Sequence, residues 1–553
     1  MNATTLANLL RSWRVRWGLM AGIVGLGGPV LALSNSVGAG GIDALKLHSE
    51  PYFLTGNKIA IGQVEIGRPS QFGLDKVAGA DLPIKVGRVF YLGQQAGPNQ
   101  YVDGHAANVA SVMISRDKTL TGVAPDAILY AAAVGPIRGR SGQPEECFAS
   151  QQLALSNGGD LRAINFSFGE SLSRDPRPDA SLDGNALLTQ CIDWSERVHD
   201  VLYVIAGNQG GGGIPIPTDN FNGINVAYSR EVDGRFIKVD FANLSSEPDF
   251  RAPRSREPES NVGDRRSVNL VAPGSQIDVI NPNGESRVVS GTSFAAPHVT
   301  ATIALLQEWV DRQIRSEAAW SLEARDPMVM KAVLLNSADK LADNGDGLLL
   351  GMARTLYDES NQTWLESDAY RDQTRPLHAD LGTGHLNASR ALQQLQGGQW
   401  SEATPVPAIG WSFGTAESPL PPTLPRTENA TLARDYVFNA PLQGGSYLSA
   451  TLVWERLVVL NDTNGNGLYD LDESFDNRGI NNLDLYLMRA ADDDIADSVW
   501  SSVSQVDSVE HIFTQIPETG QYKLRVVYRQ QVADELAQDY AFAWWAIPAA
   551  VSE

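Results

Sequence analysis

The stretch SGTSFAAPHVTATIALLQEWV, from Ser290 to Val310, is the most informative part of this sequence. Small residues and a threonine lead into Ser293, and an apolar pattern of helical period follows at once. A helix that begins here places the serine hydroxyl near unpaired backbone N–H groups and the positive end of the helix dipole. Such donors stabilise the oxyanion that forms when a hydroxyl attacks a carbonyl. Pro297 is compatible with this start, because the first helical turn has no N–H partners to lose.

Ser293 alone permits two interpretations. A serine after Gly-Thr is also a common cap of an ordinary buried helix, whereas a nucleophilic serine needs further groups elsewhere in the chain. A base must take its proton, and imidazole is suited to this because it titrates near neutrality. The imidazole in turn needs a carboxylate on its other nitrogen, which sets its tautomer and stabilises the imidazolium.

Outward from this stretch, short apolar strands alternate with helices. Strands are expected in KIAIGQVEI (58–66), AILYAAAV (127–134), AINFSFG (163–169), VLYVIAG (201–207) and SVNLVAPG (267–274). Helical patterns occupy HAANVASVMIS (105–115), SFAAPHVTATIALLQEWV (293–310) and PMVMKAVLLNSAD (327–339). Near-continuous apolar strands are typical of a mostly parallel sheet buried on both faces, so we expect an α/β domain. Active sites of such domains gather beyond the carboxyl ends of the strands.

Four motifs together resemble those of the subtilases, the subtilisin-like serine peptidases. SGTSFAAPHV is similar to the family's nucleophile motif, which implies Ser293 as the nucleophile. DGHAANVASVM (103–113) resembles its histidine helix, which implies His105 as the general base. VIAGNQG (204–210) resembles its oxyanion loop, which implies Asn208 as the side-chain donor. GTGHLNASRAL (382–392) resembles the usual end of the catalytic domain, so the resemblance covers about residues 55 to 392.

The stretch AINFSFG resembles the edge strand that pairs with the substrate backbone in this family. Contacts with the substrate are therefore implied for Asn165, Phe166, Ser167, Phe168 and Gly169. The same resemblance implies a subtilisin-like three-layer domain and a polypeptide substrate.

The acid expected before His105 departs from the family pattern. Subtilases have Asp-x-Gly after an apolar strand, and this chain has Glu65-Ile66-Gly67. Asp75, Asp81 and Asp103 lie nearby in the sequence, but none ends such a strand, so Glu65 is the candidate. Glutamate is one methylene longer, and an error of about 1 Å in this geometry costs on the order of 100-fold in rate. The residues after the histidine also differ, because His-Ala-Ala-Asn-Val-Ala-Ser replaces His-Gly-Thr-His-Val-Ala-Gly.

Chain order excludes one other serine hydrolase architecture. An α/β-hydrolase has its serine in G-x-S-x-G and its histidine last, whereas here the convincing histidine precedes Gly-Thr-Ser-Phe-Ala. His298 is expected to be a packing residue of the nucleophile helix. The other histidines have no partner pattern, and the absence of H-E-x-x-H argues against a catalytic zinc.

A second, all-β domain is expected after a boundary rich in proline. Residues 399–430 are rich in Pro, Ser and Gly, and short alternating strands follow with little helix. We therefore expect a signal peptide at 1–39, a subtilisin-like domain at 40–398, a linker at 399–430 and a β-sandwich or jelly roll at 431–550.

The segment DTNGNGLYDLDE, from Asp462 to Glu473, matches a calcium-loop pattern at every position. Oxygen ligands from a tight turn and a bidentate glutamate are what Ca²⁺ requires. The expected ligands are Asp462, Asn464, Asn466, the Leu468 carbonyl, Asp470 and Glu473. The flanking residues are typical of strands, so this is a loop between β-strands and not an EF-hand pair. An acidic surface turn is the alternative.

Composition and the N-terminus bound the cellular setting. The 553 residues are 43% hydrophobic and 20% charged, with a net charge of −22, which disfavours nucleic acid and anionic membranes as partners. Three arginines, an apolar run and small residues at the N-terminus follow the order of a secretory signal. Cleavage is expected after Val37-Gly38-Ala39 or Val30-Leu31-Ala32. Cys147 and Cys191 are either one disulfide or two unrelated buried thiols.

The sequence therefore predicts a secreted or periplasmic serine endopeptidase, monomeric and without a stable membrane partner. The proposed triad is Glu65, His105 and Ser293, with Asn208 in the oxyanion hole. The alternative is a catalytically impaired protein of the same fold that binds peptides or glycans.

Overall fold

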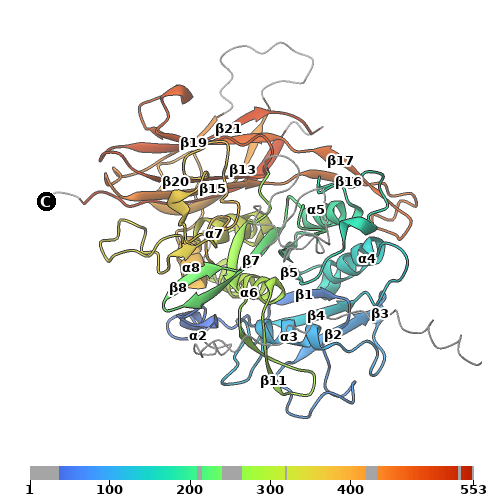
Figure 1. Cartoon of the computed structure of the whole chain (residues 1–553). Helices are drawn as coiled ribbons and strands as arrows, with labels where there is room; N and C mark the ends of the chain where they lie inside the picture. The colour runs from blue at the N-terminus through green and yellow to red at the C-terminus, as the bar shows by residue number, and fades with distance from the viewer. Residues whose placement is uncertain are drawn as a thin grey trace, which may run out of the picture. The chain divides into compact units, whose positions relative to one another are not determined.

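The computed structural model of the protein describes residues 36–207, 215–239, 265–317, 320–418, 433–533 and 537–550. A mostly parallel sheet forms its α/β part, in the strand order β12-β8-β7-β6-β5-β1-β4-β2-β3, with β9 beside β7 (Figure 1). Its strands are β1 (Ala60–Glu65), β2 (Val86–Tyr91), β3 (Gln94–Gln95), β4 (Ile128–Ala133), β5 (Leu161–Phe166), β6 (Leu202–Ala206), β7 (Ile224–Val232), β8 (Arg235–Lys238), β9 (Leu270–Pro273) and β12 (Leu356–Tyr357). The pairs β2–β3 and β7–β8 are antiparallel, and the remaining described pairs are parallel. The expected α/β class is confirmed.

Helices cover both faces of this sheet, because its strands are apolar on both sides. Along β6, Leu202 and Val204 belong to one apolar core, and Tyr203 and Ile205 belong to another. The first core is shared with α3 (Gly104–Ile114), α6 (Thr292–Ser316), α7 (Pro327–Asn336) and α8 (Ala388–Gln396). The second is shared with α4 (Gln143–Ala154) and α5 (Leu187–His199). The arrangement is the expected three layers.

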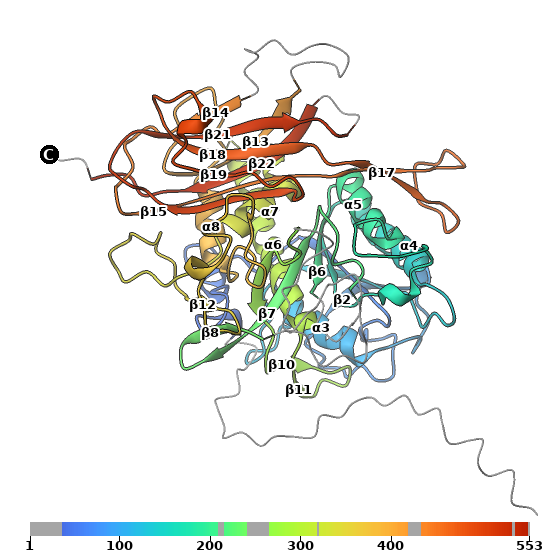
Figure 2. The same cartoon turned by 45° about the horizontal axis from the view of Figure 1, so that its top comes forward.

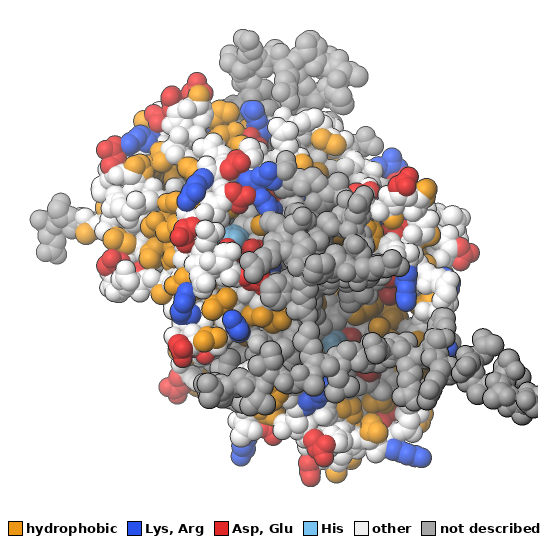
Figure 3. Space-filling view, in the orientation of Figure 1, with side chains coloured by type: hydrophobic (Ala, Val, Ile, Leu, Met, Phe, Trp, Pro, Cys, Tyr) orange, Lys and Arg blue, Asp and Glu red, His pale blue; other side chains and the backbone are white. Residues whose placement is uncertain are grey.

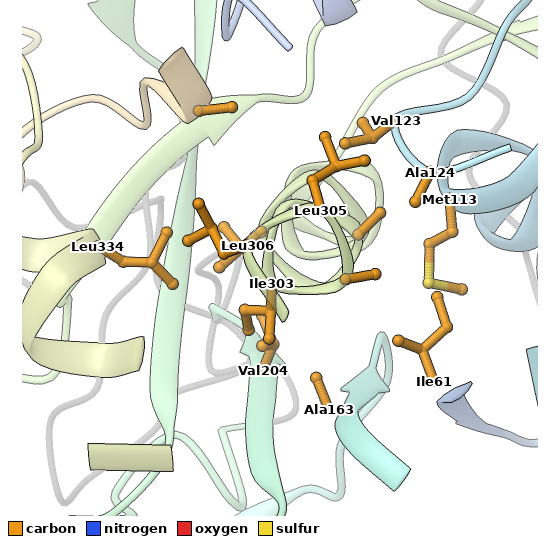
Figure 4. Close-up of a cluster of buried hydrophobic side chains, with 14 of the residues drawn as sticks. Ile61, Met113, Val123, Ala124, Ala163, Val204, Ile303, Leu305, Leu306 and Leu334 are labelled. Atoms are coloured by element: carbon orange, nitrogen blue, oxygen red, sulfur yellow. The ribbon is translucent and has the colours of Figure 1, made fainter. Parts of the chain in front are cut away.

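Helix α6 lies at the centre of the first core. Figure 4 shows its Ile303, Leu305 and Leu306 surrounded by side chains from the sheet and from neighbouring helices, including Val204 of β6 and Leu334 of α7. These side chains are fully buried. Burial of each large aliphatic side chain contributes about 1.5–3 kcal/mol, so the packing of α6 holds Ser293 at a fixed place.

The C-terminal part is a sandwich of two four-stranded antiparallel sheets, β13-β22-β15-β20 and β14-β21-β18-β19, with a separate hairpin β16–β17 (Figure 2). The strands are β13 (Ile409–Glu417), β14 (Ala433–Val437), β15 (Tyr447–Trp454), β16 (Leu457–Leu460), β17 (Phe475–Gly479), β18 (Asn482–Arg489), β19 (Trp500–Ser502), β20 (Val509–Gln515), β21 (Tyr522–Gln530) and β22 (Ala537–Trp545). Both sheets contribute to one core, which includes Leu452, Leu485 and Phe542. We call residues 409–550 the β-module.

The expected linker at 399–430 is too long. Residues 409–417 form strand β13, which pairs with β22 over its whole length, so they belong to the β-module. Trp411 of this strand is buried and donates from its indole to the carbonyl of Leu395 at the end of α8. Alternating apolar residues at 409–417, within the Pro-rich stretch, are the sequence pattern that indicates this strand. Residues 419–432 lie outside the described part of the chain.

Smaller elements complete the described structure. These are α2 (Leu45–His48), the hairpin of β10 (Ile277–Ile280) with β11 (Ser286–Val289), and 3-10 turns at Ser156–Gly158, Leu172–Arg174, Leu322–Arg325, Trp364–Glu366 and Ile495–Asp497. In the part of the chain that is described, no helix combines the length and the apolar character needed to span a bilayer. On the face drawn in Figure 3, acidic and basic side chains are interspersed among apolar and neutral ones.

The two cysteines form a disulfide between α4 and α5. Cys147 and Cys191 lie with their Cα atoms 5.8 Å apart and close a loop with a sequence separation of 44. Both are fully buried in the core that α4 and α5 share with the sheet. The open question between a disulfide and two thiols is answered in favour of the disulfide.

The first described residues are part of the folded α/β domain. Ser36 Oγ lies 2.9 Å from His298 Nε2 of α6, and Val37 and Ile42 are fully buried. Asp43 forms a buried ion pair of 2.9 Å with Arg354. The segment 36–43 therefore packs against the α/β domain, with Ser36 in contact with α6.

Candidate functional site

Ser293 lies in the first turn of α6, as expected. The helix begins at Thr292 after Gly291, whose φ of 147° is open to glycine and rarely adopted by other residues. The Thr292 hydroxyl donates to the carbonyl of Gly207 at 2.7 Å, just beyond the carboxyl end of β6. This hydrogen bond ties the start of α6 to the end of a central strand.

The expectation that Pro297 lies in the first turn of the helix is wrong. Pro297 is the sixth residue of α6, so it lies beyond the first turn and removes a helical hydrogen bond to the carbonyl of Ser293. That carbonyl instead accepts a hydrogen bond of 2.9 Å from the Ser167 hydroxyl. In return, the Ser293 hydroxyl donates to the Ser167 carbonyl at 3.1 Å. The proline thus frees an acceptor that links α6 to the segment after β5.

Glu65 and His105 meet at the carboxyl edge of the sheet. Glu65 is the last residue of β1, between β4 and β5, and its side chain is only 4% exposed. Its Oε2 lies 3.1 Å from Nδ1 of His105, the second residue of α3. Glu65, the acid predicted from its place at the end of an apolar strand, therefore lies within hydrogen-bond distance of the histidine.

Three further residues set the approach of β1 to α3. Arg68 pairs through its backbone with the residues on either side of Val102, which aligns the end of β1 with the start of α3. Gly67 permits this approach, because a Cβ there would lie 2.3 Å from that of Asp103. Gln63 donates from Nε2 to the carbonyl of Ala106 at 2.9 Å. A polar residue within an apolar strand was the signal for Gln63, and the sequence analysis missed it.

Asp103 is the N-cap of α3. Its carboxylate accepts a hydrogen bond of 3.0 Å from the N–H of Ala106. An aspartate directly before a helical apolar run is a typical N-cap signature.

The charges of this pair shift both pKa values. The Glu65 carboxylate, with a smaller contribution from Asp103, raises the pKa of His105 to about 9 against the opposing effect of burial. Burial raises the pKa of Glu65, and the neighbouring His105 partly offsets that effect. The Oε1 atom of Glu65 is buried and has no hydrogen-bond partner among the described residues. The pair therefore holds a proton on His105 at neutral pH.

Ser293 and His105 are close but do not share a hydrogen bond in the described structure. The ring of His105 lies 5.6 Å from that of Phe294, the residue next to Ser293, and the His105 side chain is 39% exposed. The Ser293 hydroxyl is directed to Ser167 instead. A hydrogen bond from Ser293 to His105 Nε2 therefore requires that the hydroxyl leave the Ser167 carbonyl.

The segment expected to bind substrate is only in part an edge. Asn165 and Phe166 belong to β5, which pairs with β1 on one side and β6 on the other, so the edge-strand prediction is wrong for them. The apolar side chains of β5 are buried on both faces, which places the strand inside the sheet. Pairing ends at Phe166, and Ser167, Phe168 and Gly169 continue beyond the carboxyl edge.

Of these three residues, Gly169 is the most exposed. Phe168 is buried and stacks on Phe166 at 4.3 Å, so its side chain belongs to the core. Asn165 donates from its amide to the Ser167 hydroxyl at 2.7 Å and thereby orients the contact between Ser167 and Ser293. The segment therefore offers backbone groups beside the nucleophile.

Asn208, expected as the oxyanion donor, lies outside the described residues, as do residues 209–214. Gly207, the residue before Asn208, directly follows β6, and its carbonyl accepts the hydrogen bond from the Thr292 hydroxyl. The last described residue before this loop is therefore in contact with the first residue of α6. His298, by contrast, is fully buried, and burial lowers its pKa to about 4, in agreement with a packing residue.

The calcium-loop segment lies between β16 and β17, two antiparallel strands, as expected. Asp462 accepts hydrogen bonds from the N–H groups of Gly467, Gly465 and Asn466, which lower its pKa. Asn464 and Asn466 both direct their amide groups to one oxygen of Asp470, at 2.6 and 3.0 Å. The amide oxygens of Asn464 and Asn466 accept from the N–H groups of Asn466 and Leu468, at 3.0 and 2.6 Å. Carboxylate and amide oxygens of this kind are the ligands that a hard cation prefers.

No group of three His, Cys, Asp or Glu side chains in the described ranges already converges in metal-binding geometry. Glu473 instead accepts from the N–H groups of Thr463 at 2.7 Å and Asp470 at 3.0 Å. Backbone N–H groups of the loop thus take up both carboxylate oxygens of Glu473.

Comparison with known proteins identifies the α/β part. The model of the Subtilase family matches residues 77–353, which include His105 and Ser293 but begin after Glu65. Subtilisin NAT of Bacillus subtilis subsp. natto is 28% identical over 290 residues, 51% of this chain and 65% of that protein. Subtilisin Savinase of Lederbergia lenta is 26% identical over 270 residues, 48% of this chain and 82% of that protein. The chain therefore spans less than two thirds of the length of the first of these relatives.

Among solved structures, the prenylagaramide maturation protease PagA is 21% identical, with a TM-score of 0.40, over 63% of this chain and 97% of that one. The family match covers half of the chain and contains the serine and the histidine whose geometry is described above. The chain belongs to the subtilase family.

Proposed function

We propose that this subtilase is an exported serine endopeptidase that hydrolyses peptide bonds through Glu65, His105 and Ser293. The observation that carries the proposal is the 3.1 Å contact between Glu65 Oε2 and His105 Nδ1, at the edge of the sheet where Ser293 begins its helix. This contact is the one that orients a histidine base. The family membership supports the reaction class.

The geometry supports a two-step acyl transfer. The Ser293 hydroxyl turns from the Ser167 carbonyl to Nε2 of His105, gives up its proton there, and bonds to the carbonyl carbon of the substrate. Glu65 stabilises the imidazolium that results. The oxyanion is stabilised by backbone N–H groups at the start of α6 and by the Asn208 side chain. His105 then protonates the leaving amine, and water releases the acyl group by the reverse sequence.

A fluorophosphonate probe tests the proposal, because it reacts covalently with an activated serine. The full chain is expected to be labelled, the Ser293→Ala variant is expected to remain unlabelled, and the Ser290→Ala variant serves as the control within the same motif. Failure of the wild-type chain to react, with or without added calcium, would contradict the peptidase proposal.

The same experiment decides the alternative of an impaired subtilase that binds peptides or glycans. The observation that favours the alternative is that the Ser293 hydroxyl donates its hydrogen bond to the Ser167 carbonyl and not to His105. Tight binding of a peptide by an unlabelled wild-type chain would establish it.

Export to the periplasm or the cell exterior is part of the proposal. The buried disulfide between Cys147 and Cys191 supports it, because disulfides persist in oxidising compartments. Residues 1–35, the greater part of the expected signal peptide, lie outside the described residues. Of the two expected cleavage sites, we favour the one after Ala32, since cleavage after Ala39 would remove Ser36 and the fully buried Val37.

Removal of the first 39 residues is therefore expected to destabilise the protein, whereas removal of the first 35 is not. Loss of the Val37 side chain and of the Ser36–His298 hydrogen bond costs about 2–4 kcal/mol in the free energy of unfolding. Urea unfolding of chains that begin at Ser36 and at Gly40 measures the difference. Equal unfolding midpoints, or a mature N-terminus at Gly40, would contradict the assignment.

Calcium binding at residues 462–473 is a further part of the proposal, with Asp462, Asn464, Asn466, the Leu468 carbonyl, Asp470 and Glu473 as ligands. The full match to the loop pattern and the convergence of Asn464 and Asn466 on Asp470 support it. When bound, the ion would supply charge neutralisation within a turn rich in carboxylates.

Calcium is therefore expected to stabilise the protein by about 2.7 kcal/mol when its free concentration is about 100 times Kd. The Glu473→Gln variant is expected to lose this gain, because it lacks a charged ligand. Asp472→Asn, a change in the same loop at a position that supplies no ligand, is the control. Calcium titration by calorimetry, together with thermal unfolding, provides the measurement. An unchanged calcium response in Glu473→Gln would overturn the assignment.

A further inference from the structure

The segment Pro215–Asn222, which resumes the described chain after the loop of Asn208, is held at its far end by an unusual number of contacts. The N–H groups of Phe221 and Asn222 donate to Oδ1 of Asp193 in α5, at 3.0 and 2.9 Å. Their carbonyl groups both accept from Nζ of Lys331 in α7, at 2.8 Å. Side chains from two helices of the α/β domain thus bind both the N–H groups and the carbonyl groups of Phe221 and Asn222.

The near end of the same segment reaches the candidate active site. Ile216 exchanges two backbone hydrogen bonds with Glu170, of 2.8 and 3.1 Å. Glu170 directly follows the Ser167–Gly169 stretch, whose Ser167 contacts Ser293 through two further hydrogen bonds. The segment 215–222 therefore connects Glu170, three residues after Ser167, with the contacts of Phe221 and Asn222 to α5 and α7. We call it the 215–222 wall.

Arg265 of the α/β part lies over the Phe221 ring at 3.7 Å, and the β-module contributes further contacts at this residue. Arg456, between β15 and β16, is 1% exposed, and its guanidinium lies 4.4 Å from the centre of the Phe221 ring. The same guanidinium forms a buried ion pair with Asp193, the residue that holds the wall by its backbone. Ser508 adds a hydrogen bond of 2.8 Å to the Phe221 carbonyl.

The backbone of Arg456 is also paired with the wall. Its N–H donates to Oδ1 of Asn222 at 2.8 Å, and its carbonyl accepts from Nδ2 of the same residue at 3.3 Å. Figures 1 and 2 agree that the β16–β17 hairpin, which begins next to Arg456, lies beside α5. The contact is thus a continuous junction between the two domains.

Charge explains why one arginine matters here. Asp193 is fully buried and holds two wall N–H groups, and a buried carboxylate without a counterion is strongly disfavoured. Arg456 provides that counterion, and its planar group also covers one face of a ring. Without the Arg456 guanidinium, Asp193 loses its ion-pair partner, and the Phe221 ring keeps the Arg265 guanidinium on it but loses that of Arg456.

We propose that Arg456 is a positioning residue for the substrate cleft, so that the β-module forms part of the peptidase through its hold on the 215–222 wall. Peptide substrates that extend along Ser167–Gly169 depend on this wall, whereas a small acylating reagent needs only the serine, the histidine and the oxyanion donors. The inference rests on the proposed peptidase function.

Steady-state kinetics of the Arg456→Met full-length variant test the inference. We expect KM for a peptide of several residues to rise about tenfold, with kcat and the rate of fluorophosphonate labelling within about twofold of the wild type. Arg456→Lys keeps the charge but not the planar contact, so it is expected to recover part of the loss. Arg489→Met removes an exposed arginine of the same module and serves as the control.

The possible outcomes separate the inference from the proposed function. A folded Arg456→Met variant with an unchanged KM overturns the inference, and so does a parallel loss of kcat, KM and labelling that tracks the unfolded fraction. If Arg456→Met does not fold, Ser508→Ala takes its place: a raised KM at constant kcat supports the inference, and an unchanged KM overturns it. A wild-type chain that neither reacts nor cleaves contradicts the proposed function itself.

Discussion

Replacing Glu65 with glutamine is expected to lower the maximal kcat/KM on the order of 10³- to 10⁴-fold. The amide no longer stabilises the imidazolium that forms as His105 takes the serine proton, and its NH₂ group favours the wrong tautomer. The fold is expected to persist, because the carboxylate accepts no backbone hydrogen bond that the amide would lose and its Oε1 has no described partner.

The pH dependence of kcat/KM provides a second test of the role of Glu65. The base form of His105 is required, and its pKa of about 9 means that kcat/KM of the wild type rises as pH increases through about 9. The charge of Glu65 is the largest cause of that raised pKa, so Glu65→Gln is expected to move the midpoint of the rise to lower pH while reducing its height. An unchanged midpoint in Glu65→Gln would show that Glu65 does not set the titration.

Glu65→Asp separates the charge from the reach of the side chain. The carboxylate stays, so the alkaline midpoint is expected to remain. Its oxygen retracts by about 1 Å from Nδ1, which is expected to cost on the order of 100-fold in rate. Glu518→Gln and Glu518→Asp, the same two changes at an exposed position of the β-module, are the matched controls. Full activity in Glu65→Asp would mean that the strand end adjusts to the shorter side chain.

Loss of the disulfide is the second large effect that we expect. Replacing Cys147 and Cys191 with alanine removes a cross-link with a sequence separation of 44, which lowers the free energy of unfolding by about 4 kcal/mol in the chain-entropy account. The closed loop contains β5 and the Ser167–Gly169 stretch, so the loss is expected to loosen the segment beside the nucleophile. Urea unfolding of the oxidised wild type and the double alanine variant measures the change.

Reduction of the wild-type protein provides the matched control for this prediction. It should reproduce the lower urea midpoint, whereas the double alanine variant should not respond to reductant. Identical midpoints for oxidised and reduced wild type would contradict a stabilising role of the bond between α4 and α5.

Several features of the site were accessible from sequence because they depend on near neighbours. Ser293 follows Gly291 and begins an apolar helix, and both signals lie within a few residues. His105 begins α3 in the same way, with Asp103 as its cap. Glu65 was assigned by its place at the end of an apolar strand, and the structure brings it within 3.1 Å of His105.

The errors arose where a distant partner decides the outcome. β5 was expected at an edge, but two strands far along the chain enclose it, and a short apolar run does not reveal which strands become its neighbours. Residues 409–417 were expected in a linker, but β22, more than 100 residues away, pairs with them. Pro297 was explained by the first turn, whereas its missing N–H frees a carbonyl for Ser167, a residue just beyond the end of β5.

The sequence by itself determined the α/β class, the order of the serine, histidine and acid stations, the β-module and the calcium-loop pattern, because each of these is encoded in local periodicity or in a short motif. Only the tertiary structure decided that Cys147 meets Cys191, that Ser36 and Val37 pack into the α/β domain, and that Arg456 pairs with Asp193 at the 215–222 wall. These contacts join residues that are distant in the chain. Their formation depends on how whole layers pack, and no local pattern reports that packing.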